Sequence, residues 1–258
     1  MSDLVMELHN RVLHLRLNRV EKCNAFDDHL LLLLQQGLDE ALANPAVRVI
    51  LLKAAGKHFS AGADIAWMQR MVQLNEAENI EDAMVLARVL FTLQQSTKPT
   101  IAMVQGAAFG GGVGLIAACD MAVAAHSARF CFSEIKLGLI PAVISPYVVN
   151  AIGARATRHL FMTAEIFDAQ TAKNLSLVQH CVADEALYDF TVEQAEKMAH
   201  LPPKALTACK RLVDEVANQP LDEKLLRYTA TCIAKQRVSA EGQKGLQAFL
   251  NKESPDWT

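Results

Sequence analysis

The spacing of hydrophobic residues predicts alternating strands and helices over the first two thirds of the chain. Runs around residues 5–8 and 12–17 alternate apolar with polar residues on either side of HNR, which predicts a β-hairpin. A leucine-rich stretch from 26 to 43 ends at an Asn-Pro pair and predicts a long helix with one face in the core. The largely apolar run VRVILLKAAG at 47–56 predicts a strand that is covered on both faces.

The same alternation continues further along the chain. A loop at 57–71 leads into a helix, a second helix is predicted at 76–95, and further strands are predicted at 121–125 and 129–132. Strands that alternate with helices are typical of an α/β fold. From Val192 onward only helical spacing remains.

The chain is therefore expected to have two parts. Its 258 residues are enough for one large domain with an appendage. We expect an α/β core with the functional site over 1–195. Residues 196–258 are expected to form a helical region that covers the pocket or serves as an oligomer surface.

One segment without charged side chains, 99–119, is long enough to cross a bilayer and has GxxxG spacing. Its character changes along its length. TIAMV is typical of a short strand, QGAAFGGG of a turn, and VGLIAAC of a new helix. We expect a strand, a glycine turn and a buried helix here, and no membrane partner.

Composition and charge argue against several function classes. The 25 Lys and Arg residues nearly balance the 28 Asp and Glu residues without a block of like charge, so nucleic acid is not an expected partner. The eight histidines and six cysteines show no spacing typical of a zinc site, so no metal is expected. Cysteines without CxxC pairs, and an N-terminus that does not resemble a signal peptide, predict a reducing, cytoplasmic location.

Two junctions between a loop and a helix are the candidate sites of chemistry, HFSAGADI at 58–65 and GAAFGGGVGL at 106–115. In each, small residues expose the backbone where a helix begins, so that free N–H groups can point at an anionic oxygen. Either junction alone is more often a tight packing turn. Together they predict an oxyanion hole, in which the loss of one donor commonly costs about 2.7–4 kcal/mol.

Several segments together resemble the crotonase superfamily of enoyl-CoA hydratases and isomerases. They are LNRVEKCNAF (17–26), HFSAGADI, KPTIAMVQGAAFGGGVGLIAACDMAVAA (98–125), FSEIKLGLIP (132–141) and AIGARATRHLFMTAEIFDAQTAKNLSLV (151–178). The resemblance implies an α/β fold built as a spiral of repeated ββα units with a helical C-terminal region. It also implies acyl-CoA thioester substrates, no separate cofactor because coenzyme A is part of the substrate, and homotrimers or dimers of trimers.

Carried over residue by residue, the resemblance implies that the N–H groups of Ala63 and Gly111 hold the thioester oxygen. Hydratases of the superfamily typically use two glutamates; this chain keeps the second as Glu134 and has Gly114 at the position of the first. Glu134 lies in an apolar run, where desolvation raises the pKa of a carboxyl group and suits it to proton transfer. We expect a hydratase with Glu134 as acid and base, and an isomerase that uses Glu134 alone remains open.

Gly114 carries a further hypothesis about the substrate. A smaller, uncharged residue frees volume and removes a negative charge, so the pocket would admit a branched acyl chain or one with its own carboxylate. The combination of GGGVGL, SAGADIAWM and LIPAVISPYVVNAIG resembles hydratases of branched-chain catabolism that act on methylglutaconyl-CoA or carboxygeranoyl-CoA.

The resemblance also implies a set of substrate-binding residues. Lys22 would meet a phosphate as a point charge, although an ordinary surface lysine is an equal reading. Asp64 is expected to cap a helix rather than to catalyse, and the N–H group of Ala142 to hold a water beside a wall stiffened by proline. The full set is Lys22, Cys23, Ala25, Ala61, Asp64, Ile65, Phe109, Gly110, Ser133 and Ala142.

Two alternatives belong to other classes. A non-catalytic acyl-CoA binder would keep the backbone donors and lack turnover. A serine hydrolase would use Ser133 or Ser145 as its nucleophile, but neither serine lies in a GxSxG motif.

Overall fold

The computed structural model describes residues 2–257 and divides into two compact units, of which the first ends at Glu196 and the second begins at Lys197. The strands, all in the first unit, are β1 (Leu4–His9), β2 (Val12–Leu17), β3 (Val49–Ala54), β4 (Thr100–Val104), β5 (Ala107–Phe109), β6 (Met121–Ala125), β7 (Arg129–Cys131), β8 (Phe167–Asp168) and β9 (His180–Val182). The helices of this unit are α1 (Asp28–Ala43), α2 (Ile65–Met71), α3 (Glu76–Gln95), α4 (Gly111–Ala117), α5 (Ser145–Thr163), α6 (Ala169–Asn174) and α7 (Leu187–Ala199), which ends just beyond the boundary. Short 3-10 turns are η1 (Val20–Lys22), η2 (Glu134–Leu137) and η3 (Asp184–Ala186).

Two sheets organise the first unit. The main sheet has six strands in the order β1-β2-β3-β4-β6-β9. β1 and β2 form the predicted antiparallel hairpin, and the other neighbours run parallel, with Leu13 opposite Ile50 and Ile101 opposite Met121. Three short strands form a second sheet in the order β5-β7-β8. The predicted α/β class is therefore confirmed.

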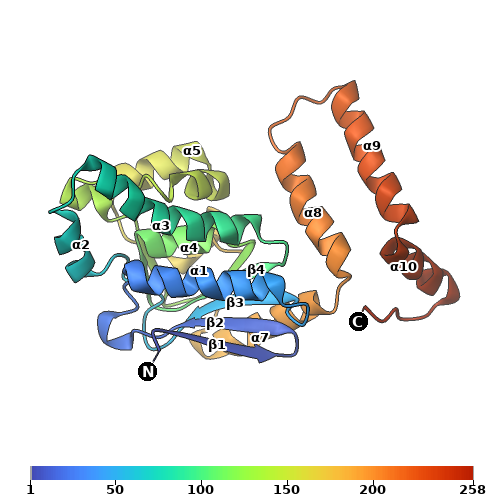
Figure 1. Cartoon of the computed structure of the whole chain (residues 1–258), viewed down its shortest axis with the longest axis horizontal. Coiled ribbons are helices and arrows are strands. Elements are labelled where there is room, and N and C mark those ends of the chain that lie inside the picture. The colour runs from blue at the N-terminus through green and yellow to red at the C-terminus, as the bar shows by residue number, and fades with distance from the viewer. Residues whose placement is uncertain (1, 258) are drawn as a thin grey trace. The chain divides into compact units, whose positions relative to one another are not determined.

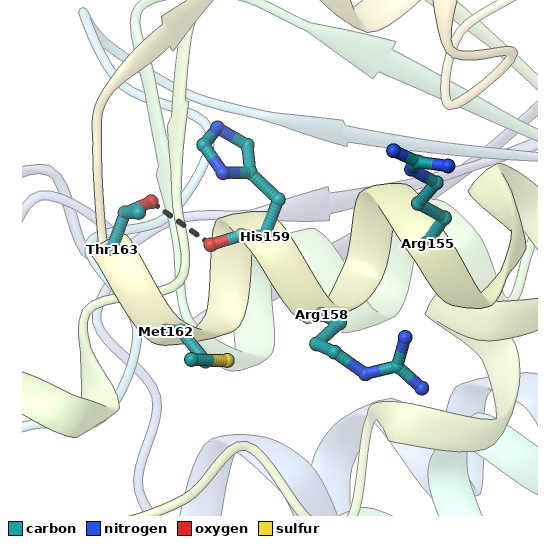
Figure 2. Close-up of a pocket in the computed structure, with 5 residues that line it drawn as sticks. All are labelled: Arg155, Arg158, His159, Met162 and Thr163. Carbon is teal, nitrogen blue, oxygen red and sulfur yellow. Dashed lines mark hydrogen bonds between the residues drawn. The ribbon is translucent and has the colours of Figure 1, made fainter.

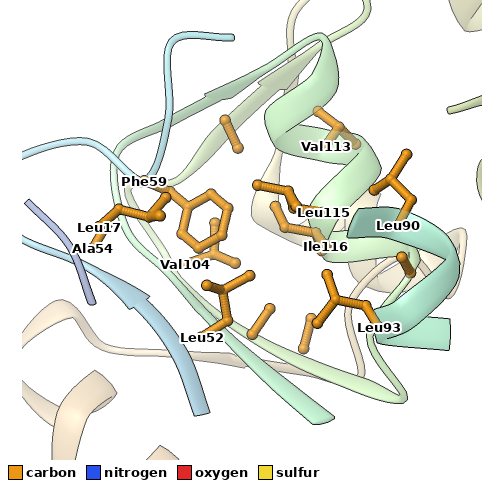
Figure 3. Close-up of a cluster of buried hydrophobic side chains, with 14 of the residues drawn as sticks. Leu17, Leu52, Ala54, Phe59, Leu90, Leu93, Val104, Val113, Leu115 and Ile116 are labelled. Atoms are coloured by element: carbon orange, nitrogen blue, oxygen red, sulfur yellow. The ribbon is translucent and has the colours of Figure 1, made fainter. Parts of the chain in front are cut away.

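The core of this unit lies between the main sheet and the helices α3 and α4 (Figures 1 and 3). Leu52 and Val104 extend from the sheet toward Leu90 of α3 and Leu115 of α4. Phe59, from the loop after β3, inserts into this cluster and is 0% exposed. Burying a phenylalanine side chain stabilises a fold by roughly 1.5–3 kcal/mol. Phe59 therefore anchors the first of the two candidate junctions on the core.

The glycine-rich segment differs from the prediction in one respect. Residues 107–109, predicted as part of a turn, form β5 because Ala108 lies opposite Phe130 of β7 and also bridges to Ser60. Helix α4 begins two residues later, at Gly111. Within residues 2–257, no helix is long and apolar enough to cross a membrane.

The second unit contains three helices, α8 (Pro203–Val216), α9 (Glu223–Val238) and α10 (Ala240–Asn251). The N-termini of α9 and α10 are capped by Asp222 and Ser239, whose side chains accept backbone N–H groups. Large apolar side chains of this unit are exposed, among them Leu201, Val213, Leu221, Leu226, Ile233, Val238, Leu246, Phe249 and Leu250.

His14 on β2 is buried, and this predicts an acid-sensitive fold. Its Nδ1 atom lies 2.9 Å from Nζ of Lys53. Burial and the Lys53 charge lower the pKa of His14 from 6.5 to about 4. Because the unfolded chain binds this proton at higher pH than the folded chain, the free energy of unfolding is expected to fall by about 2–3 kcal/mol as the pH decreases through this window. Denaturant titrations between about pH 7 and pH 4 measure the fall.

The matched control for this prediction is His14→Gln, which has no titrating group at the position. Its stability is expected to depend less steeply on pH than that of the wild type between about pH 6.5 and pH 4. Equal slopes for the two proteins would contradict the assignment of the effect to His14.

Candidate active site

Two loops that are far apart in the sequence run side by side. The N–H group of Phe59 donates to the carbonyl of Gln105 at 2.9 Å, and that of Ser60 donates to Ala107 at 3.1 Å. In return, the N–H group of Phe109 donates to the carbonyl of Ser60 at 2.9 Å. The junctions HFSAGADI and GAAFGGGVGL are therefore neighbours in the fold.

The N–H group of Ala63 donates no hydrogen bond within residues 2–257. The carbonyl of Gly62, at the other end of the same peptide group, accepts the N–H group of Phe26 at 2.9 Å. A peptide group is planar and trans, so the N–H group of Ala63 points away from Phe26. The N–H group of the next residue, Asp64, donates to the carbonyl of Phe26 at 2.9 Å. Phe26 therefore holds the backbone both before and after the N–H group of Ala63.

The N–H group of Gly111 is also without an acceptor in the described part of the chain. The carbonyl of Gly110 accepts from Val113 at 2.9 Å within the first turn of α4, so the N–H group of Gly111 points out of the helix. Phe26 touches both candidate donors: its backbone pairs with Ala63, and a Cβ on Gly111 would lie 2.4 Å from Cζ of its ring.

Three consecutive glycines are explained by three side chains that approach the backbone. A Cβ on Gly110 would lie 2.8 Å from Oε1 of Glu134, and one on Gly112 would lie 2.9 Å from Cβ of Ser60. The glycine between them faces the ring of Phe26. Gly110 also has a φ of +50°, which side-chain-bearing residues rarely adopt. The bare backbone thus lets Glu134 come close to the start of α4.

Gly114 lies one helical turn after Gly110, and the space beside it is filled. A Cβ on Gly114 would lie 2.2 Å from Cγ2 of Ile144, whose side chain is 2% exposed. The expectation that glycine frees pocket volume here is therefore wrong, because an isoleucine from a later turn occupies that volume. Glu134 thus approaches Gly110, the N-cap residue of α4, and Ile144 packs against Gly114 inside the helix.

Glu134 begins η2, and its carboxyl group reaches back to α4. Its Oε2 atom is buried and has no hydrogen-bond partner among the described residues. Desolvation raises the pKa of Glu134 above its ordinary 4.5, as expected from the apolar run, against a smaller opposing effect of its own backbone N–H group. A buried polar atom without a partner costs about 1–3 kcal/mol, and a carboxyl group whose pKa is perturbed is a candidate functional group.

Asp64 has the predicted role of a helix cap. Its Oδ1 atom accepts the N–H group of Ala66 at 2.8 Å at the start of α2. Its Oδ2 atom accepts from Nζ of Lys22 at 2.7 Å and from Nη2 of Arg19 at 3.0 Å. These contacts hold the pKa of Asp64 below its usual range, with the Lys22 hydrogen bond as the largest cause. The ammonium group of Lys22 therefore has a carboxylate partner within the protein.

Sequence reasoning missed Arg19, which is 5% exposed and binds three carboxylates. Arg19 lies in LNRVEK, close to Lys22 and Cys23, which are predicted to bind the substrate. No local signal distinguishes it from a surface arginine, because its partners come from positions up to 45 residues away.

The expected role of Ala142 is wrong. Its N–H group donates to the carbonyl of Ile140 at 2.8 Å and is engaged inside the turn before α5. The hydroxyl group of Ser145 donates to the carbonyl of Ala142 at 2.8 Å, so it is oriented by the backbone and not by a histidine. The partner of the Ser145 hydroxyl is thus a backbone carbonyl, whereas a catalytic serine is activated by a histidine.

The remaining predicted binding residues lie around the two donors. The N–H group of Ala61 donates to the carbonyl of Cys23 at 3.0 Å, which joins their two loops. Ser133 is half-buried and immediately precedes Glu134. Cys23, Ala61 and Ile65 are exposed, Ala25 and Gly110 are buried, and Phe109 is half-buried.

A surface hollow on α5 contains none of these residues (Figure 2). It is lined by Arg155, Arg158, His159, Met162 and Thr163. In Figure 2, Arg155 and Arg158 point to opposite sides of the helix, so their charges do not converge on one ligand.

Comparison with known proteins identifies the family. The model of the enoyl-CoA hydratase/isomerase family matches residues 7–258. The chain belongs to this family. A candidate enoyl-CoA hydratase/isomerase (crotonase) of Legionella pneumophila is 58% identical, with a TM-score of 0.97 and 100% of both chains covered. These findings confirm the crotonase-type fold.

Two further enoyl-CoA hydratase/isomerase relatives are similar over almost their whole length. An enoyl-CoA hydratase from Shewanella pealeana is 42% identical, with a TM-score of 0.96, over 99% of this chain and 96% of that one. The 2,3-dehydroadipyl-CoA hydratase of Escherichia coli is 31% identical over 100% of this chain and 99% of its own. The chain is thus an enzyme of the hydratase/isomerase family that acts on acyl-CoA thioesters.

Proposed function

We propose that this enzyme adds water to a 2-enoyl-CoA thioester, with Glu134 as the single acid and base and the N–H groups of Ala63 and Gly111 as donors to the thioester oxygen. The observation that supports this most strongly is the buried Oε2 atom of Glu134 without a partner, in a carboxyl group that packs beside Gly110. The residue after Gly110 is Gly111, whose N–H group has no acceptor among the described residues.

The proposed reaction needs one proton carrier. The carboxylate of Glu134 takes a proton from water while the resulting hydroxyl group bonds to the β-carbon and the double bond shifts toward the thioester. The enolate oxygen is stabilised by the two backbone donors, which act more strongly on the developing charge than on the neutral carbonyl. Glu134 then returns its proton to the α-carbon, so the elements of one water are added and the carboxylate is regenerated.

For the acyl chain, we propose a short branched chain with its own carboxylate, as in 3-methylglutaconyl-CoA. The missing charge at Gly114 supports this, because a second carboxylate there would repel such a substrate. The apolar side chain of Ile144, which fills the space beside Gly114, suits a methyl branch. The E. coli relative is named for a substrate with a terminal carboxylate, 2,3-dehydroadipyl-CoA.

A second candidate is an isomerase that moves the double bond of a 3-enoyl-CoA into conjugation. The packing of Ile144 against Gly114 favours it, because this position then offers no second carboxylate to hold a water. In this reaction Glu134 removes a proton from the α-carbon and returns it to the γ-carbon, so no water is consumed.

The absorbance of the conjugated thioester distinguishes these functions. Purified enzyme is mixed separately with 3-methylglutaconyl-CoA, crotonyl-CoA and a 3-enoyl-CoA. A fall with the first supports the proposed hydratase, and a rise with the third alone supports the isomerase. Binding of all three without any change in absorbance would contradict both and favour a non-catalytic acyl-CoA binder.

The raised pKa of Glu134 predicts the acid limb of the pH profile. Glu134 must be ionised to accept a proton, so activity is lost as the pH falls through its pKa, which burial places above 4.5. We expect kcat/KM to decline at a higher pH than for an ordinary glutamate. Circular dichroism at each pH separates this decline from acid unfolding. An acid limb at or below about pH 4.5, the ordinary pKa of this group, would contradict the prediction.

We also propose that the enzyme is a homotrimer or a dimer of trimers. The exposed apolar side chains of the helical unit support an assembly, since Leu221, Val238 and Phe249 are each at least 77% exposed in the single chain. Light scattering is expected to give three or six times the 28.2 kDa chain mass. A monomeric mass would contradict this prediction.

A further inference from the structure

Arg19 makes an unusual set of contacts for a single buried side chain. Its guanidinium group lies 3.3 Å from Asp3, 3.0 Å from Asp27 and 3.0 Å from Asp64. Its Nη1 atom also donates to the carbonyl of Ala25 at 2.9 Å. Lys22 adds a second positive charge to the cluster through Asp64.

The contact with Ala25 starts a line of hydrogen bonds that ends at the proposed catalytic donor. The carbonyl of Ala25 and the N–H group of Phe26 are opposite ends of one peptide group, and this N–H group donates to the carbonyl of Gly62 at 2.9 Å. The carbonyl of Gly62 and the N–H group of Ala63 are opposite ends of the next peptide group. The line therefore runs from Arg19 through two peptide groups to the N–H group of Ala63, which has no acceptor within residues 2–257.

Hydrogen bonds in such a line polarise one another. A charged donor makes a shorter and stronger bond than a neutral one, and it draws electron density from the carbonyl that accepts it. The N–H group at the other end of that peptide then becomes a better donor, and the effect passes to the next peptide. The three carboxylates around Arg19 offset its charge at long range, but its N–H group contacts the carbonyl of Ala25 directly.

The same side chain also fixes the direction of the last donor. Asp64, the residue after Ala63, is held by Arg19 through its side chain and by Phe26 through its backbone N–H group. Among the described residues, the carbonyl of Gly110, which shares a peptide group with the N–H of Gly111, accepts only backbone N–H groups of α4, so no charged side chain supports Gly111 in the same way. The N–H group of Ala63 is therefore supported by a charged side chain, whereas the N–H group of Gly111 is supported by backbone groups.

We propose that Arg19 is a positioning residue that aims and strengthens the N–H group of Ala63 through the peptide groups that end at Phe26 and Ala63. This inference rests on the proposed oxyanion hole. It predicts that Arg19 affects the polarisation of the thioester carbonyl and the rate of turnover more than it affects acyl-CoA affinity.

The test measures the carbonyl directly. Crotonyl-CoA with a ¹³C-labelled thioester carbonyl is bound to a Glu134→Gln parent that does not turn it over, and the infrared stretching frequency is recorded. Donors lower this frequency relative to the free thioester. When Arg19→Gln is added to the Glu134→Gln parent, the decrease in carbonyl frequency on binding is expected to be smaller than in the parent alone. In the enzyme with Glu134 intact, Arg19→Gln is expected to reduce kcat about tenfold with little change in KM, since one donor is weakened and not deleted.

Two further variants separate this effect from a loss of stability. Asp3→Asn is the matched control, because Asp3 binds the Nε atom of the same guanidinium group, whereas Asp27 contacts the Nη1 atom that donates to Ala25. It is expected to lower the denaturation midpoint and leave the carbonyl frequency unchanged. Arg19→Lys keeps the positive charge but lacks the planar guanidinium group that reaches Asp64 and Ala25 together. It is expected to fold more readily than Arg19→Gln and to show a carbonyl frequency between those of the parent and Arg19→Gln.

The outcomes are distinguishable. Suppose that the Glu134→Gln parent lowers the carbonyl frequency, and that Arg19→Gln and Arg19→Lys, once shown to be folded, lower it as much as the parent does. The role of Arg19 is then overturned while the oxyanion hole stands. The inference is equally overturned if Asp3→Asn shifts the frequency as much as Arg19→Gln. If the parent binds crotonyl-CoA without lowering the frequency, the proposed oxyanion hole fails and the role of Arg19 fails with it.

Discussion

Replacing Glu134 by Gln is expected to lower kcat by about 100- to 10,000-fold while acyl-CoA binding is retained. The amide has nearly the size of the carboxyl group, but it cannot take a proton from water and return it to carbon. Because Oε2 of Glu134 is buried without a partner, a neutral group at this position has a smaller desolvation cost. We therefore expect the free energy of unfolding to stay the same or to rise. The absorbance of the conjugated thioester gives kcat, and isothermal titration gives the affinity.

The matched control is Glu165→Gln, which removes an exposed carboxylate paired with His159 on the surface. This variant is expected to keep the wild-type rate. Retention of activity by Glu134→Gln would eliminate both the hydratase and the isomerase mechanisms proposed above. A loss of binding together with the loss of turnover would mean that Glu134 supports the pocket and does not carry the proton.

Replacing Gly114 by Glu is expected to destabilise the fold by about 1–3 kcal/mol and to leave the hydration of a straight 2-enoyl-CoA no faster. The reason is steric, because the Cβ atom alone would approach Cγ2 of Ile144 to 2.2 Å. The new side chain must displace Ile144 or turn away from Glu134. Denaturant titration measures the stability, and the absorbance assay with crotonyl-CoA measures the rate.

A second substitution separates packing from charge in this prediction. Gly114→Glu combined with Ile144→Ala removes the obstructing side chain, so part of the lost stability is expected to return through a favourable coupling energy. The cavity-forming variant Ile144→Ala alone is expected to be destabilised by about 2–5 kcal/mol. Strictly additive stability changes would contradict the direct packing of the two positions. Faster hydration of crotonyl-CoA by the single Gly114→Glu variant would contradict the view that Ile144 closes this space.

The order and type of many elements could be predicted from the sequence. The structure has a helix at Glu76–Gln95 and the hairpin of β1 and β2 at the predicted places. These features depend on the spacing of apolar residues and on stop signals a few positions away, which lie on the same stretch of chain. The family was also recognisable from short segments, since their small residues mark where the backbone must remain bare.

The tertiary structure alone decided what each bare position faces. Gly110 faces Glu134 and Gly114 faces Ile144, and neither pair can be inferred from local spacing. The same holds for Arg19, whose contacts with Asp64 cross 45 positions of sequence. A periodic pattern reports which side of an element is buried, whereas a contact between two elements depends on how distant loops pack. The sequence thus determined where the backbone can be approached, and only the packing of the folded chain determined which side chain approaches it.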